Sequence, residues 1–285
     1  MKIIETIVKT KAQIRTWRNV VESYATIGFV PTMGALHEGH LSLIKRSVKE
    51  NDKTVVSIFV NPTQFAPNED LSNYPRTFES DCELCQKAGV DLIFCPSSKE
   101  MYKENFSTFV NMSDTELTSD LCGKSRPTHF RGVCTVVNKL FNIVKPDYAY
   151  FGQKDAQQLA VIKRMVRDLD LDVKIVSCPI VRERDGLAKS SRNVYLNTDE
   201  RNAALVLSRV LFEGERLFLS GEKDVKIIIN AIKRLCESEP LAKIDYIEIV
   251  NPDTMQRLTE IRTNALIAIA VYVGNTRLID NIVLN

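Results

Sequence analysis

Short apolar runs alternate with amphipathic segments through the first 180 residues, and this alternation constrains the fold more than any other feature. Strands that are apolar along their whole length are buried on both faces, as in a parallel sheet covered by helices. The sequence therefore predicts an α/β fold with a doubly wound parallel sheet. The expected strands are 27–31, 54–60, 90–96, 148–152 and 172–181, and the expected helices are 39–51, 78–89, 132–146 and 153–170.

The pattern changes after residue 180. Two helices are expected at 198–221 and 224–238, and three strand-like runs follow them: IDYIEIVN, ALIAIAVYVG and RLIDNIVL. We therefore expect two domains, 1–180 and a smaller α+β domain over 181–285. Their boundary is placed at the polar loop VRERDGLAKSSRN (181–193).

Composition excludes several classes of protein. The net charge of +2 over 285 residues leaves no basic stripe for nucleic acid or an anionic membrane. The N-terminal stretch MKIIETIVKTKAQIRTW lacks the apolar core of a secretory signal, and the run ALIAIAVYV is far too short to span a bilayer. Seven scattered cysteines do not resemble a disulfide framework. We expect a soluble, reduced, cytoplasmic protein with no nucleic-acid or membrane partner.

Two of the three histidines lie in FVPTMGALHEGHLSLIKRS (29–47), where an expected strand gives way to a helix. Ligands of a doubly wound sheet bind beyond the carboxyl ends of its strands, and this stretch has that position. Gly34 and Gly39 allow a close backbone approach, and the helix that begins near Gly39 offers N–H groups to a phosphate. His37 and His40 would donate hydrogen bonds to phosphate oxygens as negative charge develops.

Two other interpretations of this histidine pair remain open. The pair could ligate a metal ion, although zinc would need a third or fourth ligand and His129 is the only other histidine. It could also have no role beyond the entry of a helix. The stretch matches neither the G-x-G-x-x-G dinucleotide fingerprint nor the G-x-x-x-x-G-K-[ST] P-loop.

Two later blocks carry groups that suit a nucleotide. In RERDGLAKSSRNVYL (182–196), the run Lys189–Arg192 supplies an ammonium, two hydroxyls and a guanidinium for a leaving pyrophosphate, unless it is a solvated loop. In YFGQKDAQQLAVIKR (150–164), Lys154 could reach a phosphate. Asp155 could cap a helix, bind a ribose or hold Mg²⁺ indirectly. With the histidine motif, a late Lys/Ser loop indicates nucleotidyl transfer to a carboxylate or phosphate, as in class I aminoacyl-tRNA synthetases.

Neutral amides follow a strand in FVNPTQFAPNEDLSNYPRT (59–77). Asn61 and Gln64 suit the carboxylate and hydroxyl of a hydroxy acid, because an amide recognises these groups without neutralising the nucleophile. An ordinary turn at Asn61 and Pro62 is the alternative.

A weaker block is CGKSRPTHFRGVCTVV (122–137), in which Arg126, His129 and Arg131 precede an expected helix. These residues would add positive potential near an acidic substrate, and a surface loop is the alternative. The cysteine pair in CELC (82–85) has redox or zinc spacing but lies in an amphipathic helix without a partner pair, which indicates packing.

In this order, the blocks resemble the pantoate–β-alanine ligase (pantothenate synthetase) family. The resemblance rests on PTMGALHEGH, FVNPTQF, YPRT, HFRGV, FGQKDAQQL and DGLAKSSRN. It implies a homodimer whose chain has a Rossmann-like domain that binds nucleotide and pantoate and a smaller C-terminal domain that closes over the ATP site. It also implies two steps. ATP and pantoate give pantoyl adenylate and pyrophosphate, and β-alanine then gives pantothenate and AMP, with Mg²⁺ accompanying ATP.

The resemblance assigns roles to residues. His40 matches the residue given the acid role, His37 its phosphate-binding companion, and Lys154 completes the catalytic set. Gln64 matches a contact to both pantoate and β-alanine, and Gln158 a contact to pantoate. The implied ATP contacts are Met33, Gly34, Ala35, Leu36, His37, Glu38, Gly39, His40, Gly152, Gln153, Lys154, Asp155, Val181, Lys189, Ser190, Ser191 and Arg192, and the implied substrate contacts are Gln64, Gln158, Asn61, Tyr74 and Arg126, with no metal ligand.

Three residues depart from the family pattern. Lys189 stands where methionine is common, Gln153 where glutamate is frequent, and Thr128 where glycine is usual. Lys189 adds a charge near the phosphates, and none of the three removes a group that the chemistry needs.

Two other function classes stay open. One is an adenylyltransferase that uses a phosphopantetheine or nicotinamide nucleotide acceptor, although such an acceptor would want more basic residues than the Gln64 and Gln158 amides supply. The other is a nucleotide sensor without activity, against which the intact His37–His40 and Lys189–Arg192 sets argue.

Overall fold

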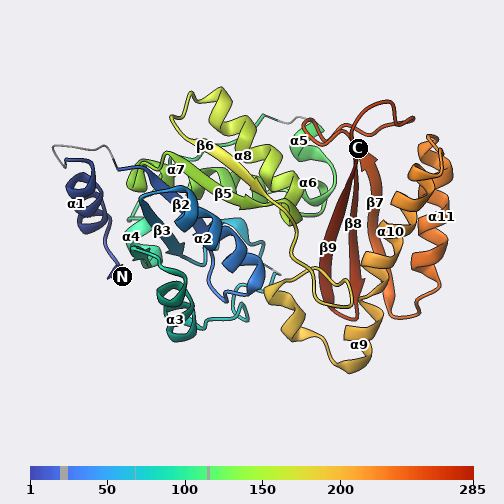
Figure 1. The fold of residues 1–285 in the computed structure, drawn as a ribbon, viewed down its shortest axis with the longest axis horizontal. Helices are drawn as coiled ribbons and strands as arrows, with labels where there is room; N and C mark the ends of the chain where they lie inside the picture. The colour runs from blue at the N-terminus through green and yellow to red at the C-terminus, as the bar shows by residue number, and fades with distance from the viewer. Residues whose placement is uncertain (20–24, 68, 114–115) are drawn as a thin grey trace. The chain divides into compact units, whose positions relative to one another are not determined.

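The computed structural model describes residues 1–19, 25–67, 69–113 and 116–285 (Figure 1). The chain divides into two compact units, and each contains its own sheet. Unit 1 comprises Met1–Ser113, Arg126–Gly152 and Val161–Cys178, and unit 2 comprises Asp114–Ser125, Gln153–Ala160 and Pro179–Asn285.

Unit 1 is built on a six-stranded sheet in the order β1-β4-β3-β2-β5-β6, and all its strand pairs are parallel. The order runs from β2 to β3 and β4 on one side and to β5 and β6 on the other. The topological switch point, where such sheets bind ligands, therefore lies at the carboxyl ends of β2 and β5. The strands are β1 (Lys2–Ile4), β2 (Ile27–Thr32), β3 (Lys53–Ile58), β4 (Leu92–Phe94), β5 (Tyr148–Gly152) and β6 (Lys174–Cys178).

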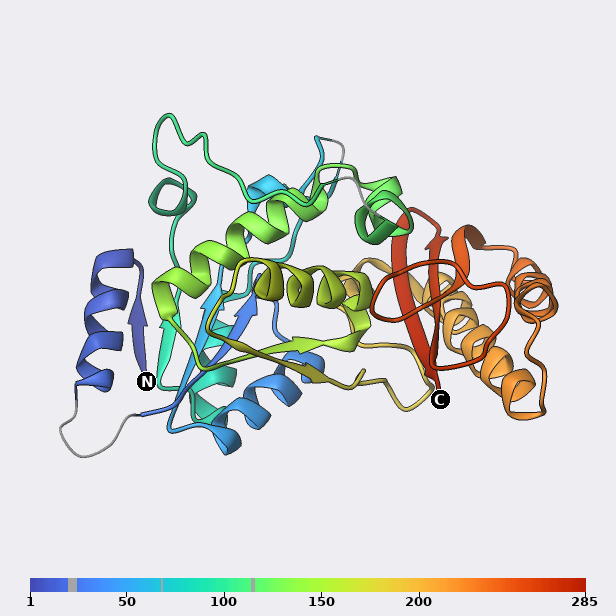
Figure 2. The ribbon, with the colours of Figure 1, turned by 90° about the horizontal axis from the view of Figure 1, so that it is seen from above.

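Helices cover both faces of this sheet, as two neighbouring residues of β2 show. Val30 packs in a buried cluster with Ile44 of α2 (Glu38–Glu50) and Cys85 of α3 (Phe78–Ala88). The ring of Phe29, by contrast, meets Phe141 of α7 (His129–Val144) edge-on at 6.4 Å. Successive side chains of a strand point to opposite faces, so α2 and α3 cover one face and α7 the other (Figure 2). The helices of unit 1 are α1 (Ile7–Arg18), α2 (Glu38–Glu50), α3 (Phe78–Ala88), α4 (Ser98–Met101) and α7 (His129–Val144), with the 3-10 turn η1 (Pro62–Gln64) and the part of α8 (Ala156–Asp168) that begins at Val161.

The N-terminal segment holds two elements that the sequence analysis did not predict, β1 and α1. Strand β1 has only three residues and pairs with β4 at the edge of the sheet. A run this short shows no periodicity, and only its partner strand makes it a strand. The histidine motif consequently follows the second strand of the chain rather than the first.

Unit 2 is built on the antiparallel sheet β7-β8-β9, whose apolar residues form a core with those of α10 and α11. Helix α10 approaches the sheet closely at Gly214, where a Cβ atom would lie 2.5 Å from the Cδ1 atom of Ile267. The helix expected at 198–221 is two helices, α9 and α10, separated at Ala204 and Leu205. The elements are α5 (Glu116–Ser119), α6 (Cys122–Ser125), η2 (Gln153–Asp155), the first residues of α8, η3 (Ser191–Tyr195), α9 (Thr198–Ala203), α10 (Val206–Leu219), α11 (Val225–Glu237), β7 (Ala242–Val250), β8 (Ala265–Val273) and β9 (Thr276–Leu284).

The predicted fold class, a doubly wound parallel sheet with a smaller α+β part, is thus confirmed. The run ALIAIAVYV is the central strand β8, as expected for a buried strand.

Within the described residues, no helix is both long and apolar enough to cross a membrane. The seven cysteines all lie in that part of the chain and are free thiols.

Candidate active site

The histidine motif forms the cap of α2, which begins after the carboxyl end of β2. His37 is the N-cap residue, and its Nδ1 atom accepts a hydrogen bond of 3.1 Å from the N–H of Gly39. The Nδ1 atom of His40 accepts one of 3.3 Å from the N–H of His37. Two imidazoles thus form a capping box, a role that Ser or Thr and Glu or Gln usually have. The two ring centroids lie 4.1 Å apart.

This cap determines what the two rings can do. A ring nitrogen that accepts a hydrogen bond carries no proton, so the proton of each neutral ring lies on Nε2. Protonation at Nδ1 would break the cap. The geometry therefore prepares His37 and His40 as two Nε2–H donors. In the described part of the chain, no third His, Cys, Asp or Glu joins them in a group that could hold a metal ion.

The turn before the cap depends on Asp81, which the sequence analysis missed. Gly34 and Ala35 both have left-handed backbone, with φ of 83° and 50°, a conformation that costs alanine more than glycine. Asp81 of α3 is 1% exposed, and its carboxylate accepts hydrogen bonds from the N–H groups of Ala35 (2.9 Å) and Leu36 (2.8 Å). These two N–H groups are therefore directed at Asp81. The one available signal was that Asp81 shares a helix face with Cys85, which is also buried.

The predicted amides lie in the segment that follows β3: Asn61 is the N-cap of η1, Gln64 is the last residue of η1, and both are buried. The Nδ2 atom of Asn61 donates to Gln64 Oε1 (3.1 Å) and to the carbonyl of Gly132 (3.2 Å), and Tyr102 donates to Asn61 Oδ1 (2.7 Å). The Nε2 atom of Gln64 points at the sulfur of Met33 at 3.1 Å. Asn61 thus stabilises the turn η1, and Gln64 lies beside Met33 of the histidine motif.

Gly132 explains why η1 lies so close to α7. A Cβ atom at this position would lie 2.4 Å from the carbonyl oxygen of Thr63 and 2.6 Å from the backbone of Gln64, so a larger residue would push the turn away.

Tyr74, a predicted substrate contact, is 4% exposed, and its ring meets Phe65 edge-on at 6.0 Å.

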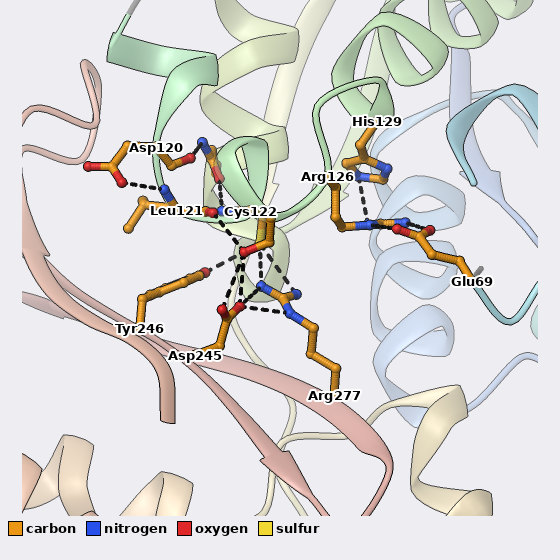
Figure 3. A network of polar contacts seen from close by, with 11 residues as sticks. Glu69, Asp120, Leu121, Cys122, Arg126, His129, Asp245, Tyr246 and Arg277 are labelled. Atoms are coloured by element: carbon orange, nitrogen blue, oxygen red, sulfur yellow. Dashed lines mark hydrogen bonds and ion pairs between the residues drawn. The ribbon is translucent and has the colours of Figure 1, made fainter. Parts of the chain in front are cut away.

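Arg126 lies in a network with Glu69 and His129 (Figure 3). Its Nε and Nη2 atoms donate to the two oxygens of Glu69 at 2.7 and 2.6 Å, and its Nη1 atom lies 3.1 Å from Nε2 of His129. Both Arg126 and His129 also contact the carbonyl oxygen of Gln64, at 3.3 and 3.0 Å. Burial raises the pKa of Glu69, but the hydrogen bonds and charge of Arg126 outweigh burial and hold that pKa below its usual value. The charge of Arg126 is thus compensated, and the network supports Gln64 through its main chain.

Two adjacent glutamines of α8 differ in their surroundings. Gln157 is 6% exposed and accepts a hydrogen bond from the N–H of Cys122 (2.9 Å), while its Nε2 atom donates to the carbonyls of Leu117 (3.0 Å) and Asp120 (2.8 Å). It therefore anchors the segment that contains α5 and α6. Gln158, the predicted pantoate contact, is only partly buried.

The same segment is bound to the antiparallel sheet of unit 2 (Figure 3). Arg277 donates to Asp245 at 3.0 and 2.7 Å and to the sulfur of Cys122 at 3.7 Å, and the hydroxyl of Tyr246 lies 3.3 Å from that sulfur. Burial raises the pKa of Tyr246 well above its usual value. This cluster holds α6 on strands β7 and β9.

The basic run Lys189–Arg192 follows a tight loop of unit 2. The N–H of Lys189 donates to the carbonyl of Val181 at 2.9 Å, so these two predicted ATP contacts lie side by side. The ammonium of Lys189 lies 4.0 Å from the carboxylate of Glu183. Ser190 caps η3, and its hydroxyl accepts from the N–H of Arg192 at 3.3 Å.

The turn η2 carries Lys154 and Asp155. The ammonium of Lys154 lies 3.9 Å from the carboxylate of Asp155, which is the more exposed of the two side chains. The carbonyls of Gln153 and Lys154 both accept hydrogen bonds from Asn281 of β9. Sequence reasoning missed Asn281, because the polar pair Asp280 and Asn281 in a largely apolar run gives no local sign of which distant groups it contacts.

The predicted site residues are divided between the two units. Unit 1 contains those of the switch point and the amide turn: Met33, Gly34, Ala35, Leu36, His37, Glu38, Gly39, His40, Asn61, Gln64, Tyr74, Arg126 and Gly152. Unit 2 contains the others: Gln153, Lys154, Asp155, Gln158, Val181, Lys189, Ser190, Ser191 and Arg192.

Comparison with known proteins identifies the family. The model of the family described as pantoate-beta-alanine ligase matches residues 2–283. The chain is 58% identical over 285 residues to the pantothenate synthetase of Thermotoga petrophila, with 100% of each chain covered. It is 57% identical over 283 residues to that of Acetivibrio thermocellus, with 99% of each covered.

Solved structures agree with this match. The crystal structure of pantothenate synthetase from Thermus thermophilus is similar at a TM-score of 0.93 and 44% identity, over 99% of each chain. Pantoate-beta-alanine ligase from Francisella tularensis, in complex with beta-gamma ATP and beta-alanine, is similar at a TM-score of 0.79 and 36% identity, over 99% of this chain and 97% of that one. From its full-length match and these relatives, the chain belongs to the pantoate-beta-alanine ligase family.

Proposed function

We propose that this chain condenses pantoate with β-alanine in an ATP-dependent reaction that passes through pantoyl adenylate and releases AMP and pyrophosphate. The observation that carries the proposal is that one family model spans residues 2–283, so every block of the candidate site lies inside the match. The relative from Francisella tularensis, solved with beta-gamma ATP and beta-alanine, supports the nucleotide and the amine as ligands of this chain.

In the first step, the carboxylate of pantoate attacks the α-phosphorus of ATP. A bond forms between this oxygen and phosphorus, and the bond to pyrophosphate breaks. Both reactants are anionic, so positioning and charge stabilisation carry the catalysis. We assign the Nε2–H groups of His37 and His40 to phosphate oxygens whose charge grows in the transition state. Lys154, Lys189 and Arg192 supply positive charge for the leaving pyrophosphate.

In the second step, the amine of β-alanine attacks the carbonyl carbon of the mixed anhydride. A C–N bond forms, the C–O bond to AMP breaks, and the amine loses a proton, which leaves with the phosphate of AMP and passes to solvent. The motifs contain no strong base for this proton. We therefore assign to the protein the holding of the acyl adenylate and the exclusion of water, with Gln64 and Gln158 binding pantoate through neutral amides.

We propose MgATP as the nucleotide substrate, because Mg²⁺ in such sites is held by substrate phosphates and one or two carboxylates. The carboxylate of Asp155, exposed beside Lys154, is the candidate oxygen ligand of Mg²⁺ in the turn that we assign to ATP.

We also propose that residues 1–180 bind nucleotide and pantoate, and that 181–285 contribute the run Lys189–Arg192. A homodimer and a cytoplasmic location are further proposals, which light scattering and cell fractionation would test.

The first test is pyrophosphate-dependent exchange into ATP, measured with and without pantoate and in the absence of β-alanine. Exchange only with pantoate is the expected result, and it would establish the acyl-adenylate step. β-Alanine should then drive the release of AMP. Exchange with a phosphorylated acceptor instead of pantoate would indicate an adenylyltransferase. ATP binding without exchange with any acid would indicate a sensor.

A further inference from the structure

Strand β9 contains two adjacent buried polar residues, Asp280 (2% exposed) and Asn281 (4% exposed). Buried polar side chains need partners. Apart from the N–H of Asn281, which donates to Asp280, the side-chain partners of these two residues lie far away in the sequence. None of the steps assigned above uses either residue. Their contacts all lie within unit 2, and they lead to the two segments of that unit that we assign to ATP.

Asn281 holds the turn that carries Lys154. Its Nδ2 atom donates to the carbonyl oxygens of Gln153 and Lys154, each at 2.9 Å. One amide thus fixes two successive carbonyls of η2. Because the backbone of the turn is fixed, so is the direction in which the side chain of Lys154 extends from it. An aspartate of the same shape could not donate to either carbonyl.

Asp280 holds the loop that leads to Lys189. Its two oxygens accept from Nη1 (2.6 Å) and Nη2 (3.0 Å) of Arg182, a bidentate pair with a fixed orientation. The Nη1 atom of Arg182 also donates to the carbonyl of Gly186 at 3.1 Å, where the loop turns with φ of 100°. Arg182 pairs with Ala188, the residue before Lys189, in an isolated β-bridge.

We propose that Asp280 and Asn281 are positioning residues for ATP, which hold the Lys154 turn and the Lys189 loop in a fixed register at two successive positions of β9. Successive side chains of a strand point to opposite faces, so the single strand β9 holds one basic segment from each of its faces. The cationic side chains that bind a triphosphate must lie at fixed positions relative to its phosphates. A displacement of such a side chain by about 1 Å can lower the rate strongly. This inference rests on the assignment of both segments to ATP in the proposed function.

Asn281→Asp tests the proposal with almost no change in shape. The variant is purified as the full chain, and calorimetric titration measures its affinity for ATP and for AMP well below its unfolding temperature. We expect ATP affinity to fall by roughly 10-fold and AMP affinity by no more than about 2-fold, because the lost hydrogen bonds orient groups for the outer phosphates. Asn142→Asp is the matched control, since Asn142 is exposed on α7 and should bind both nucleotides like the parent.

Two further variants keep the proposal testable if a buried aspartate prevents folding. Asn281→Ala removes the same hydrogen bonds without adding a charge, and Arg182→Lys keeps the charge but loses the bidentate pair. Each should lower ATP affinity more than AMP affinity. Folded variants that bind both nucleotides like the parent, or lose both equally, would overturn the inference. Failure of the proposed function is a separate result, because it would appear in the parent as an absence of pantoate-dependent exchange.

Discussion

The two units position their candidate ATP-binding groups in different ways. In unit 1, His37 and His40 cap their own helix through contacts three residues apart or fewer. In unit 2, the Lys154 turn and the Lys189 loop are held by side chains of β9 that are 98 to 128 positions away in the sequence. The histidine pair therefore depends chiefly on a local motif. The basic groups depend on a complete antiparallel sheet.

The left-handed turn before the histidines lies between these extremes. Asp81 holds Ala35 and Leu36 from 45 or 46 positions away, by way of a helix on one face of the parallel sheet. Even the local motif thus needs one tertiary contact, which fixes the backbone from which His37 begins. Variants of the histidine pair, of Asp81 and of the β9 residues should therefore separate local from long-range positioning.

The largest effect is expected at the histidines. His40→Ala should lower kcat by about 100-fold or more while ATP affinity changes much less, because the Nε2–H hydrogen bond strengthens as charge develops. Loss of the cap should cost only about 1 kcal/mol of stability. Steady-state kinetics and thermal unfolding measure the two effects, with His37→Ala as the parallel variant. A large loss of ATP affinity at unchanged kcat would contradict this role.

A smaller effect is expected from Asp81→Asn. The amide keeps one oxygen that accepts from one of the N–H groups of Ala35 and Leu36, but it turns its own NH2 group toward the other N–H group. The turn therefore relaxes, and kcat/KM for ATP should fall by roughly 10-fold. Glu79→Gln, which removes an exposed carboxylate on the same helix, is the matched control. If Asp81→Asn destabilises the chain but leaves the kinetics of the folded enzyme unchanged, the turn does not position the histidines.

The smallest effect is expected from Glu69→Gln. Because Arg126 holds the folded-state pKa of Glu69 below its usual value, the pair adds stability above the usual carboxyl pKa, and this stability is lost as the pH falls through the lowered pKa. The variant should be less stable by about 1 kcal/mol at neutral pH, and the difference should disappear as the pH falls below the usual carboxyl pKa and through the lowered pKa of Glu69. Urea unfolding at a series of pH values measures this difference.

The exposed pair Lys87–Glu83 offers a control for that experiment, since both side chains are more than 70% exposed. Glu83→Gln should change the free energy of unfolding by less than about 0.5 kcal/mol. An equal effect of the two variants would mean that the Glu69 pair adds nothing beyond an ordinary surface ion pair.

Much of the fold was predictable, because its signals are local. The strands are short apolar runs and the long helices have amphipathic periodicity, so their type could be read without knowledge of their neighbours. Strand β1 was missed since pairing with β4 alone makes it a strand. The break between α9 and α10 was missed because apolar spacing continues across it.

The sequence alone determined the alternation of strands and helices, the blocks of chemical groups and their resemblance to one family. The tertiary structure alone decided which polar residues support those blocks: Asp81 behind the histidine loop, Glu69 beside Arg126, and Asp280 with Asn281 on β9. The physical reason is that a buried hydrogen bond between residues distant in sequence has no periodicity and no fixed spacing. A single polar residue on a buried face becomes informative only once its partner is known.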